Sequence, residues 1–386
     1  QLSAISYQQV PSTSISSNLK PQTSPLPMLE IRTFDGSPAE LAEFCVSCWR
    51  SIYQGTDMPF LLWSGEFFDW ELFGPRHSER EFVVAAYDGA RLVGVLPARP
   101  VPVSLHGEPL NCTICSYFSV DPEYRKTRAA AQLNIESRRR HRDRGVDFMF
   151  GYVYTGASAS RGAGFWLKQP KHVKVIRQVG HWVRVLDHRA VARFNRHGLD
   201  RWGARMLGLV QRPVQPPRDG TGVRPYEPRD LAACQALARS MADECELSYI
   251  WETDVFERQI AFGDVTRTLV AEEDARVTGF INYCHLGFRH IDDEGDSEIK
   301  VAVIDLLSIR QASRRMQKRL LQQALADMRA EGCHLAMMLR SPCHDWGPLL
   351  RRGFVMQPSA QYAFTMVETN GREAPVGIRR LHVHWR

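Results

Sequence analysis

The chain has 386 residues, of which 44% are hydrophobic and 24% charged, and a net charge of +6. The length exceeds that of one typical domain and the composition is that of globular proteins, so we expect two globular domains. No apolar run approaches the roughly 18 residues of a membrane-spanning helix, and no basic-then-apolar signal pattern is present. These features argue against a membrane span and predict a cytoplasmic protein.

Much of the positive charge lies in one run at residues 138–144, Arg-Arg-Arg-His-Arg-Asp-Arg. Such a run is usually the solvated end of a helix, and the alternative is a docking face for a polyanionic partner. Nucleic acid is the weaker alternative, because no basic groove with interleaved aromatic residues accompanies the run. We therefore expect no nucleic-acid partner.

Four of the nine cysteines form two pairs with Cys-x-x-Cys spacing, Cys45/Cys48 and Cys112/Cys115. Two such pairs ordinarily suggest zinc. The first pair lies in an amphipathic helix pattern, and the second lies in a strand-like run, where positions three apart point to opposite faces. We therefore predict buried, reduced thiols and no metal site.

The first half of the chain has a clear order of predicted elements. Residues 1–28 are rich in Ser, Thr, Gln and Pro and predict a disordered tail. The elements expected after it are a strand at 28–32, a helix at 37–53 with the capping box Ser37-Pro38-Ala39-Glu40, a hairpin of 82–87 and 92–97, a strand at 113–120, a helix at 126–145 and a strand at 148–154.

The same order returns in the second half. Its expected elements are a strand and helix opening at 223–231, a hairpin of 268–271 and 277–281, a strand at 301–309, a helix at 314–332 and a strand at 334–339. This internal repeat predicts an α/β (α+β) fold of two tandem domains, 29–211 and 223–386, joined by the Pro-rich linker 212–222. The sheets are expected to be mixed, splayed where the long helix begins, and flanked by helices.

The most informative segment is 117–131, a strand followed by a Pro-bearing turn and an abrupt helix. Exposed amides and the helix dipole make such a helix start an anion site. Arg125, Lys126 and Arg128 surround it, and the small residues at 129–131 allow a phosphate to approach the backbone. An ordinary basic first turn is the less favourable interpretation, because cations at that end oppose the dipole. The segment therefore fits a pyrophosphate.

The pattern Arg125-x-x-Arg128-x-Ala130 resembles the acyl-CoA loop of the GNAT superfamily, Arg/Gln-x-x-Gly-x-Gly/Ala. Arg128 replaces the central Gly, as in the N-myristoyltransferase branch, whose loop resembles Leu-Arg-Ser-Lys-Arg-Val-Ala. The resemblance implies two tandem GNAT domains, with acyl-CoA or acyl-phosphopantetheine as co-substrate. The residues it assigns to donor binding are Ser119, Val120, Arg125, Lys126, Thr127, Arg128, Ala129 and Ala130.

Other segments are similar to the same branch, in order over about residues 55–386. Residues 64–72 resemble Ser-Pro-Glu-Phe-Leu-Leu-Trp-Ala-Leu, and 222–225 resemble Gly-Leu-Arg-Pro. Val-Tyr-Thr-Gly at 153–156 resembles Val-Tyr-Thr-Ala-Gly, and from this likeness Tyr154, Thr155 and Gly156 are expected to bind substrate. The second half has bulky residues at 313–317 where a phosphate loop needs Gly or Ala. We expect that half to build the acceptor groove instead.

The expected chemistry is attack of a neutral amine on a thioester. A strand that stops pairing before the helix exposes amides to the carbonyl oxygen, and the resemblance assigns this role to the amides of Tyr117 and Phe118. By the same resemblance the general base is the terminal carboxylate, that of Arg386. Asp305, which interrupts an apolar strand, and the pair His382/His384 are rival bases, and Asp305 is equally a candidate for a partnered core acid.

Three functions follow from these observations. The first is an N-acyltransferase that moves a probable fatty acyl group from acyl-CoA or an acyl carrier protein to an amine of a peptide or amino acid. The run at 138–144 suits the acidic docking helix of such a carrier protein. The second is a short-chain acetyltransferase of a small amine, and the third is a catalytically silent acyl-CoA-binding protein.

Overall fold

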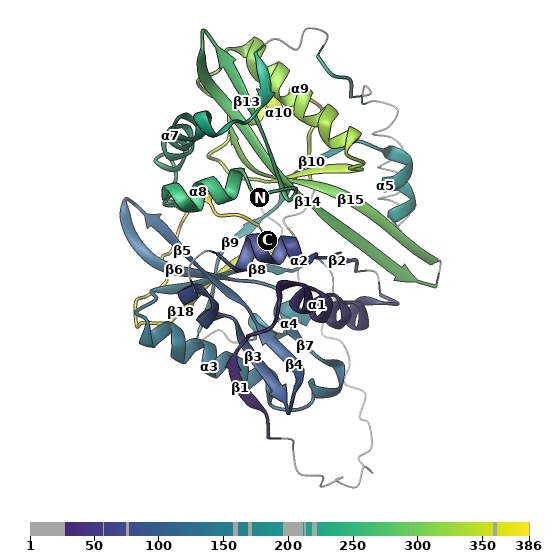
Figure 1. Ribbon diagram of the computed structural model, residues 1–386, viewed down its shortest axis with the longest axis vertical. Coiled ribbons are helices and arrows are strands. Elements are labelled where there is room, and N and C mark those ends of the chain that lie inside the picture. Colours follow the sequence, from purple (N-terminus) through teal and green to yellow (C-terminus); the bar gives the residue numbers. More distant parts are fainter. Residues whose placement is uncertain are drawn as a thin grey trace, which may run out of the picture.

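The computed structural model describes residues 28–56, 58–74, 77–156, 161–168, 172–195, 211, 214–217, 222–293, 295–357 and 361–385. Residues 1–27 of the predicted tail, most of the predicted linker and Arg386 lie outside these ranges. Three sheets account for the described strands (Figure 1). The four-stranded sheet lies in the lower lobe of Figure 1, the eight-stranded sheet in the upper lobe, and the seven-stranded sheet between them.

The four-stranded sheet belongs entirely to the first half. Its order is β1 (Glu30–Thr33), β3 (Val84–Asp88), β4 (Arg91–Leu96) and β7 (Ser119–Val120). Helix α3 (Ala129–Asp143) packs on β3 and β4, and α1 (Pro38–Tyr53) contacts β7. The predicted capping box begins α1, because Ser37 Oγ accepts from the Glu40 amide at 3.2 Å and Glu40 accepts from the Ser37 amide at 2.6 Å. The short elements around this sheet are α2 (Gly65–Leu72), η1 (His77–Phe82), η2 (Pro122–Tyr124) and α4 (Arg161–Trp166).

The seven-stranded sheet takes strands from both halves. Its order is β19 (Leu381–His382), β12 (Leu247–Tyr249), β5 (Ala98–Leu105), β6 (Glu108–Cys115), β8 (Phe148–Tyr154), β18 (Tyr362–Glu368) and β9 (Val173–Val179). Strand β18 pairs with β8 on one side and with β9 on the other. A strand of the second half therefore completes the central sheet of the first.

The eight-stranded sheet belongs mainly to the second half and also contains strands of the first half. Its order is β11 (Val223–Pro225), β13 (Thr266–Glu273), β14 (Arg276–Asp292), β15 (Gly295–Ser308), β16 (Leu335–Leu339), β10 (His181–Val185) and β17 (Val355–Met356), and β2 (Phe60–Leu62) pairs with β14. Its helices and the short turns near it are α5 (His188–Phe194), η3 (Pro228–Asp230), α7 (Leu231–Ala242), α8 (Thr253–Ile260), α9 (Arg314–Ala330) and α10 (Trp346–Arg351). The predicted domains 29–211 and 223–386 thus exchange strands.

The internal repeat is visible in one parallel strand pair of each half. Strand β6 pairs with β8 as far as Ile114 and Phe150, and β15 pairs with β16 as far as Ile304 and Met338. Beyond these residues the first strand of each pair continues toward a long helix, α3 or α9, without its parallel neighbour. The mixed, splayed sheets predicted from the sequence are confirmed.

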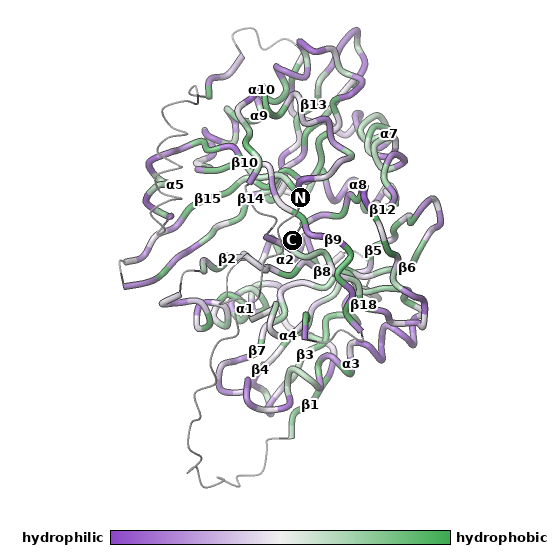
Figure 2. Tube along the Cα trace, turned by 180° about the vertical axis from the view of Figure 1, so that it is seen from behind, coloured by the Kyte–Doolittle hydropathy of each residue, from purple (hydrophilic) through white to green (hydrophobic). Residues whose placement is uncertain are grey.

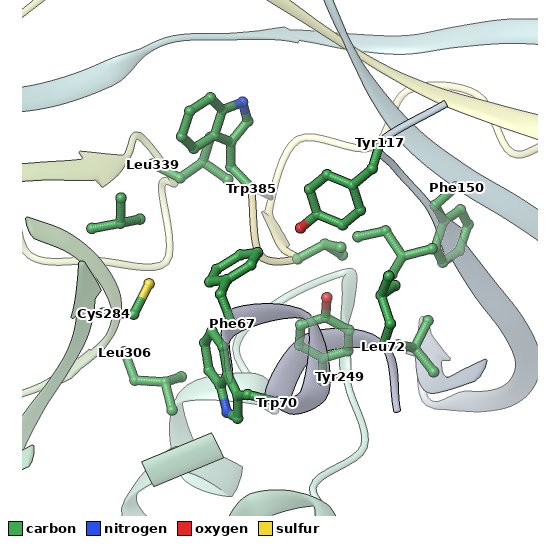
Figure 3. Close-up of a cluster of buried hydrophobic side chains, with 14 of the residues drawn as sticks. Phe67, Trp70, Leu72, Tyr117, Phe150, Tyr249, Cys284, Leu306, Leu339 and Trp385 are labelled. Atoms are coloured by element: carbon green, nitrogen blue, oxygen red, sulfur yellow. The ribbon is translucent and has the colours of Figure 1, made fainter. Parts of the chain in front are cut away.

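One large core joins the halves. Figure 3 shows Phe67 and Tyr117 of the first half in the same cluster as Tyr249, Leu306 and Trp385 of the second. The chain is hydrophobic along the central strands and hydrophilic at many outer turns (Figure 2). This shared core explains why the two halves do not separate into independent bodies.

The four cysteines of the Cys-x-x-Cys pairs are free thiols, as predicted. Burial raises the pKa of Cys45, Cys48 and Cys115 to about 12, so these thiols stay protonated. A disulfide joins Cys245, after α7, to Cys343, after β16, at a separation of 98 residues. The sequence analysis did not predict it.

No helix in the described part of the chain is long and apolar enough to span a membrane.

His141 is a buried histidine that links α3 to β6. Its Nε2 lies 2.7 Å from Thr113 Oγ1 and its Nδ1 2.6 Å from the Ser137 carbonyl. Burial lowers its pKa to about 4, so below an unfolded value near 6.5 the unfolded chain binds the proton more readily. The stability contribution is present above about pH 6.5 and is lost as the pH falls toward 4.

Between pH 7 and pH 4.5, protonation of His141 should lower the free energy of unfolding of the wild type by up to about 3 kcal/mol. We expect His141→Gln to lack this part of the pH dependence. Urea unfolding at both pH values measures this difference. Exposed His106 is the control site, and His106→Asn should keep the wild-type pH dependence. An unchanged pH dependence in His141→Gln would contradict the assignment.

Candidate functional site

The backbone turns abruptly at Tyr117, between the end of β6 and the start of β7. The φ angle of Tyr117 is 60°, in the left-handed region that non-glycine residues rarely adopt. Such a conformation costs on the order of 1 kcal/mol or more and persists only where its surroundings hold it. The break in strand pairing expected before the helix is therefore present, and it is concentrated at this residue.

Helix α1 and β7 hold the Tyr117 carbonyl in place. The carbonyl oxygen accepts from Ser119 Oγ at 2.8 Å and from Cys45 Sγ at 3.7 Å. Trp49 Nε1 in turn donates to Ser119 Oγ at 3.1 Å. The C=O and N–H of one trans peptide point in opposite directions, so the Phe118 N–H points away from these groups of α1 and β7. The arrangement frees one amide for a partner on the other side of the strand.

The side chains at the turn are packed. The Tyr117 ring lies 5.2 Å from the Trp63 ring and 5.0 Å from the Phe68 ring, both of which are buried. The Phe118 ring contacts those of Phe165 and Trp166 on α4. Both predicted oxyanion residues thus use their side chains for packing, which leaves any role in charge stabilisation to their backbone.

Helix α3 starts at Ala129, three residues later than the sequence suggested, after the turn η2. Thr127 Oγ1 accepts from the Ala129 amide at 3.2 Å. Within the described part of the chain, no hydrogen bond is found for the amides of Lys126, Arg128, Ala130 or Ala131. The first turn of α3 contains no acidic residue and Arg128 makes no capping bond. The positive end of the helix is therefore open to an anion.

The basic residues of this segment differ in what they contact. Arg125 binds two backbone carbonyls, with Nε 3.3 Å from the Val120 oxygen and Nη2 3.2 Å from the Cys48 oxygen. Its guanidinium therefore ties the loop to α1 and β7. The side chains of Lys126 and Arg128 are exposed beside the helix start. Ser119, Val120 and Ala129 are buried, and Ala130 is half-buried.

The start of α9 in the second half is closed by the protein itself. Ser313 Oγ accepts from the Met316 amide at 3.2 Å, and Glu273 Oε2 accepts from the Ser313 amide at 2.9 Å. Although burial acts in the opposite direction, hydrogen bonds from Ser313 and Thr278 hold the pKa of Glu273 below its usual value. A carboxylate thus occupies the place that is open at α3. This contrast supports a donor site in the first half alone.

Tyr154 is the last residue of β8, and Thr155 and Gly156 follow it. The Thr155 amide donates to the Gln361 carbonyl at 2.7 Å, and the Tyr154 ring lies 5.0 Å from the Tyr362 ring. A Cβ at Gly156 would lie 2.8 Å from the Tyr154 ring and 2.9 Å from Gln361 Cγ. Only glycine fits this close approach of β8 to the segment before β18.

A cleft lies between the two halves. It is lined by Trp70, Glu71, Gly74, Arg99, Pro100, Val101, Pro102, Tyr249, Ile250, Trp251, Asp254, Val255, Arg258, Gln259 and His384. Buried Glu71 pairs with Arg99 at 3.3 Å. The indole N–H of Trp251 is buried and has no hydrogen-bond partner among the described residues. Aromatic walls with a few convergent polar groups are typical of a ligand site.

Of the rival bases, only His384 lines this cleft. Its ring packs on Tyr249 at 4.8 Å and on Trp251 at 5.5 Å. Buried Asp305 is the extra residue of a bulge in β15, and its carboxylate accepts from Gln259 Nε2 at 3.1 Å, so it lies behind the cleft wall as a partnered acid. Burial lowers the pKa of His382 to about 4. Arg386 lies outside the described residues.

The sequence analysis missed four residues of the cleft, namely Glu71, Arg99, Trp251 and Gln259. One signal was available. Glu71 stands where the family segment that residues 64–72 resemble has Ala. A carboxylate at a position that is apolar in the family indicates a buried charge that needs a partner. The others carry no local pattern, because the cleft assembles from α2, β5 and α8.

Residues 38–165 match the family described as an acetyltransferase (GNAT) domain. This segment is a GNAT domain. The GNAT domain contains α1, the strained turn at Tyr117 and the open start of α3. Comparison of the whole chain with curated proteins found no sequence match.

Solved structures resemble the chain beyond this GNAT domain. A crystal structure of Saccharomyces cerevisiae N-myristoyltransferase with bound myristoyl-CoA has a TM-score of 0.68 and 15% identity, over 95% of this chain and 92% of that chain. A second structure of that enzyme with myristoyl-CoA has a TM-score of 0.67 and 16% identity, over 90% and 81%. A GCN5-related N-acetyltransferase from Anabaena variabilis has a TM-score of 0.50 and 11% identity, over 88% and 72%.

The family match confirms a GNAT domain at residues 38–165, and the solved structures confirm the predicted tandem GNAT fold of the N-myristoyltransferase type. At such identities the solved structures establish the fold alone. Among the described residues, no three His, Cys, Asp or Glu side chains are grouped as metal ligands.

Ser119 is the residue by which the turn at Tyr117 is most directly tested. We expect Ser119→Ala to lower the free energy of unfolding by about 1–2 kcal/mol, because a buried carbonyl loses its donor. Urea denaturation measures the change. Exposed Ser51 on α1 is the control, and Ser51→Ala should stay within about 0.5 kcal/mol of wild type. Equal stability of both variants would argue against this hydrogen bond.

Proposed function

We propose that the protein transfers a fatty acyl group from acyl-CoA to an amine of a peptide or amino acid. The observation that carries the proposal is the strained turn at Tyr117 directly before the open start of α3. This combination offers one free amide beside a helix end that attracts anions. The fold shared with N-myristoyltransferase supports an acyl donor of the CoA type.

The donor is proposed to lie along the GNAT domain's splayed strands. The amides of Ala130 and Ala131, with Lys126 and Arg128 beside them, would hold the pyrophosphate. The Phe118 amide, with that of Tyr117, would face the thioester oxygen. Tyr154, Thr155 and Gly156 on the neighbouring strand remain proposed substrate contacts.

Acyl-CoA is favoured over an acyl carrier protein by the pairing of the basic run. Arg139 bonds Glu136 and Asp143, and Arg140 bonds Glu136 and Thr33. Arg144 pairs with Glu81 at 2.6 Å. Because the charges of Arg139, Arg140 and Arg144 are already compensated within the protein, the run offers an acidic docking helix only Arg138 and Arg142, which have no ion pair among the described residues.

The reaction would begin with attack of the amine nitrogen on the thioester carbonyl carbon. Negative charge then grows on the carbonyl oxygen, where a backbone donor is worth about 3–4 kcal/mol of barrier. The C–S bond breaks as the C–N bond forms, and CoA leaves as a thiolate. The amine proton passes to a base, for which we propose His384, the candidate that lines the cleft.

The cleft between the halves is the proposed acceptor site. Asp254 supplies a carboxylate for a cationic amine, whereas Glu71 is already paired with Arg99, and the Trp251 N–H supplies a donor for a carbonyl of the acceptor. These groups suit a peptide or amino acid better than a bare alkylamine. Both halves build this wall, with seven lining residues from the first half and eight from the second.

We also propose a cytoplasmic location. The seven free cysteines of the described residues fit a compartment that keeps thiols reduced. The disulfide between Cys245 and Cys343 is the exception, and a reducing compartment would favour opening it.

A short-chain acetyltransferase is the second candidate, because the matching family is described as an acetyltransferase domain. Thioesters of acetyl, octanoyl, lauroyl and myristoyl groups with a peptide acceptor, followed by mass spectrometry, separate the two. We expect faster transfer of the longer chains. Preference for acetyl would favour the second candidate, and thioester binding without transfer would favour a silent protein.

Arg128 and Arg314 form a matched pair at the starts of α3 and α9. We expect Arg128→Glu to weaken acyl-CoA binding at least about tenfold, which is roughly 1.4 kcal/mol, because the phosphates lose an exposed cation and meet an anion. Arg314→Glu should bind acyl-CoA like wild type. Isothermal titration calorimetry measures both. Equal effects of the two variants would contradict a donor site at α3.

His384→Gln tests the proposed base. We expect kcat at pH 7 to fall about 100-fold or more, while the Kd for acyl-CoA stays unchanged. The rate of the variant should rise toward alkaline pH, because more of the acceptor amine is then unprotonated without help. A kcat at pH 7 equal to that of wild type would eliminate His384 as the base.

A further inference from the structure

A second cavity lies wholly within the second half. It is lined by Leu237, Ser240, Met241, Glu244, Leu307, Ser308, Ile309, Arg310, Gln311, Cys343, His344 and Asp345. Its walls are α7, the end of β15 and the turn after β16. It therefore occupies the splay of the second half, the counterpart of the splay that holds the proposed donor in the first.

The end of β15 offers a strand edge to this cavity. Residues 306–308 pair with β14 on one side, but parallel pairing with β16 has stopped at Ile304 and Met338. Backbone groups on the uncovered edge need partners. An extended chain with amide groups can supply them by adding to the edge as a further strand.

His344 points to a polar ligand in the same cavity. Its residue surface is only 7% exposed, and neither ring nitrogen has a hydrogen-bond partner among the described residues. Burial, with His382 and Arg310 nearby, lowers the pKa of His344 well below its usual value, so the ring is neutral at pH 7. A neutral imidazole has one donor and one acceptor nitrogen, which match the C=O and N–H of an amide.

The remaining lining favours a neutral ligand. Leu237, Met241 and Leu307 make the walls apolar. At the mouth, Arg310 and Arg380 both bond Glu244, and Asp345 adds a second carboxylate, so the charges of these four side chains sum to zero. The start of α9 nearby is already occupied by the Glu273 carboxylate. The start of α9 is therefore closed to a phosphate, whereas the cavity of the second half suits an uncharged ligand.

We propose that this cavity binds an extended secondary amide, held by His344 and by the edge of β15 at residues 306–308. Two sources carry this chemistry, a phosphate-free pantetheine arm and a short peptide segment. The proposal does not depend on the transfer reaction, because it concerns a different cavity and different residues.

The test uses the full-length protein and two probes, pantetheine and N-acetylalanine methylamide. Two-dimensional NMR of the histidine rings, with His344 assigned from the spectrum of His344→Leu, reports on the cavity directly. We expect a saturable shift of the His344 signals with at least one probe. The probe that binds more tightly identifies the source.

Variants separate this site from the donor and acceptor sites. His344→Leu should weaken binding of the probe at least about tenfold, and His344→Gln, which keeps a donor and an acceptor, should retain most of it. Ser240→Phe at the rim should block entry without touching His344. His384→Gln, in the other cleft, should leave amide binding unchanged while it lowers acyl transfer.

Three results would overturn the proposal. The first is a shift that grows linearly with either probe and does not saturate. The second is tight binding that persists in both His344→Leu and Ser240→Phe. The third is equal loss of binding in His384→Gln and His344→Leu. If His344→Leu does not fold, as judged by its thermal transition, His344→Gln and Ser240→Phe decide the question.

Discussion

The candidate site depends on the direction of one carbonyl group, that of Tyr117. Ser119 and Cys45 draw this oxygen toward α1, and Trp49 fixes the Ser119 hydroxyl from the helix side. The left-handed backbone that results is unfavourable for tyrosine by itself, so the surrounding packing must stabilise it. The strained residue lies where the strand leaves its parallel neighbour, directly before the Phe118 amide.

The two helix starts differ in a way that suits the single donor site proposed for this duplicated fold. Helix α3 leaves its first amides open, whereas α9 directs its own toward Ser313 and Glu273. The difference rests on a few side chains rather than on the fold. A repeat can therefore keep its architecture while one copy gives up phosphate binding.

Much of the fold could be predicted from the sequence, because its signals are local. The Ser37 capping box, the turn at Gly89 and the order of elements in each half follow from periodicity and turn residues. The exchange of β10 and β18 could not be predicted, since alternation identifies a strand but not its neighbour. The disulfide between Cys245 and Cys343 was missed for the same reason.

The site was predicted unevenly. The segment from Tyr117 to Ala131 carries its proposed chemistry in consecutive residues, so it could be proposed from the sequence. The left-handed φ angle at Tyr117 could not be predicted from the residue type, because Gly or Asn usually occupies such positions. Here tertiary contacts impose the angle on a tyrosine. Asp305 was visible as a break in an apolar strand, but only the bulge and Gln259 explain why it lies behind the cleft wall.

The placement of β18 between β8 and β9 has a consequence for biosynthesis. Ribosomes would release β8 and β9 long before β18, which begins at Tyr362, and the two earlier strands have no direct pairing with each other. The central layer therefore keeps open strand edges until the segment from Tyr362 has been synthesised. Contacts this distant in the chain slow folding and leave partly folded intermediates exposed to aggregation.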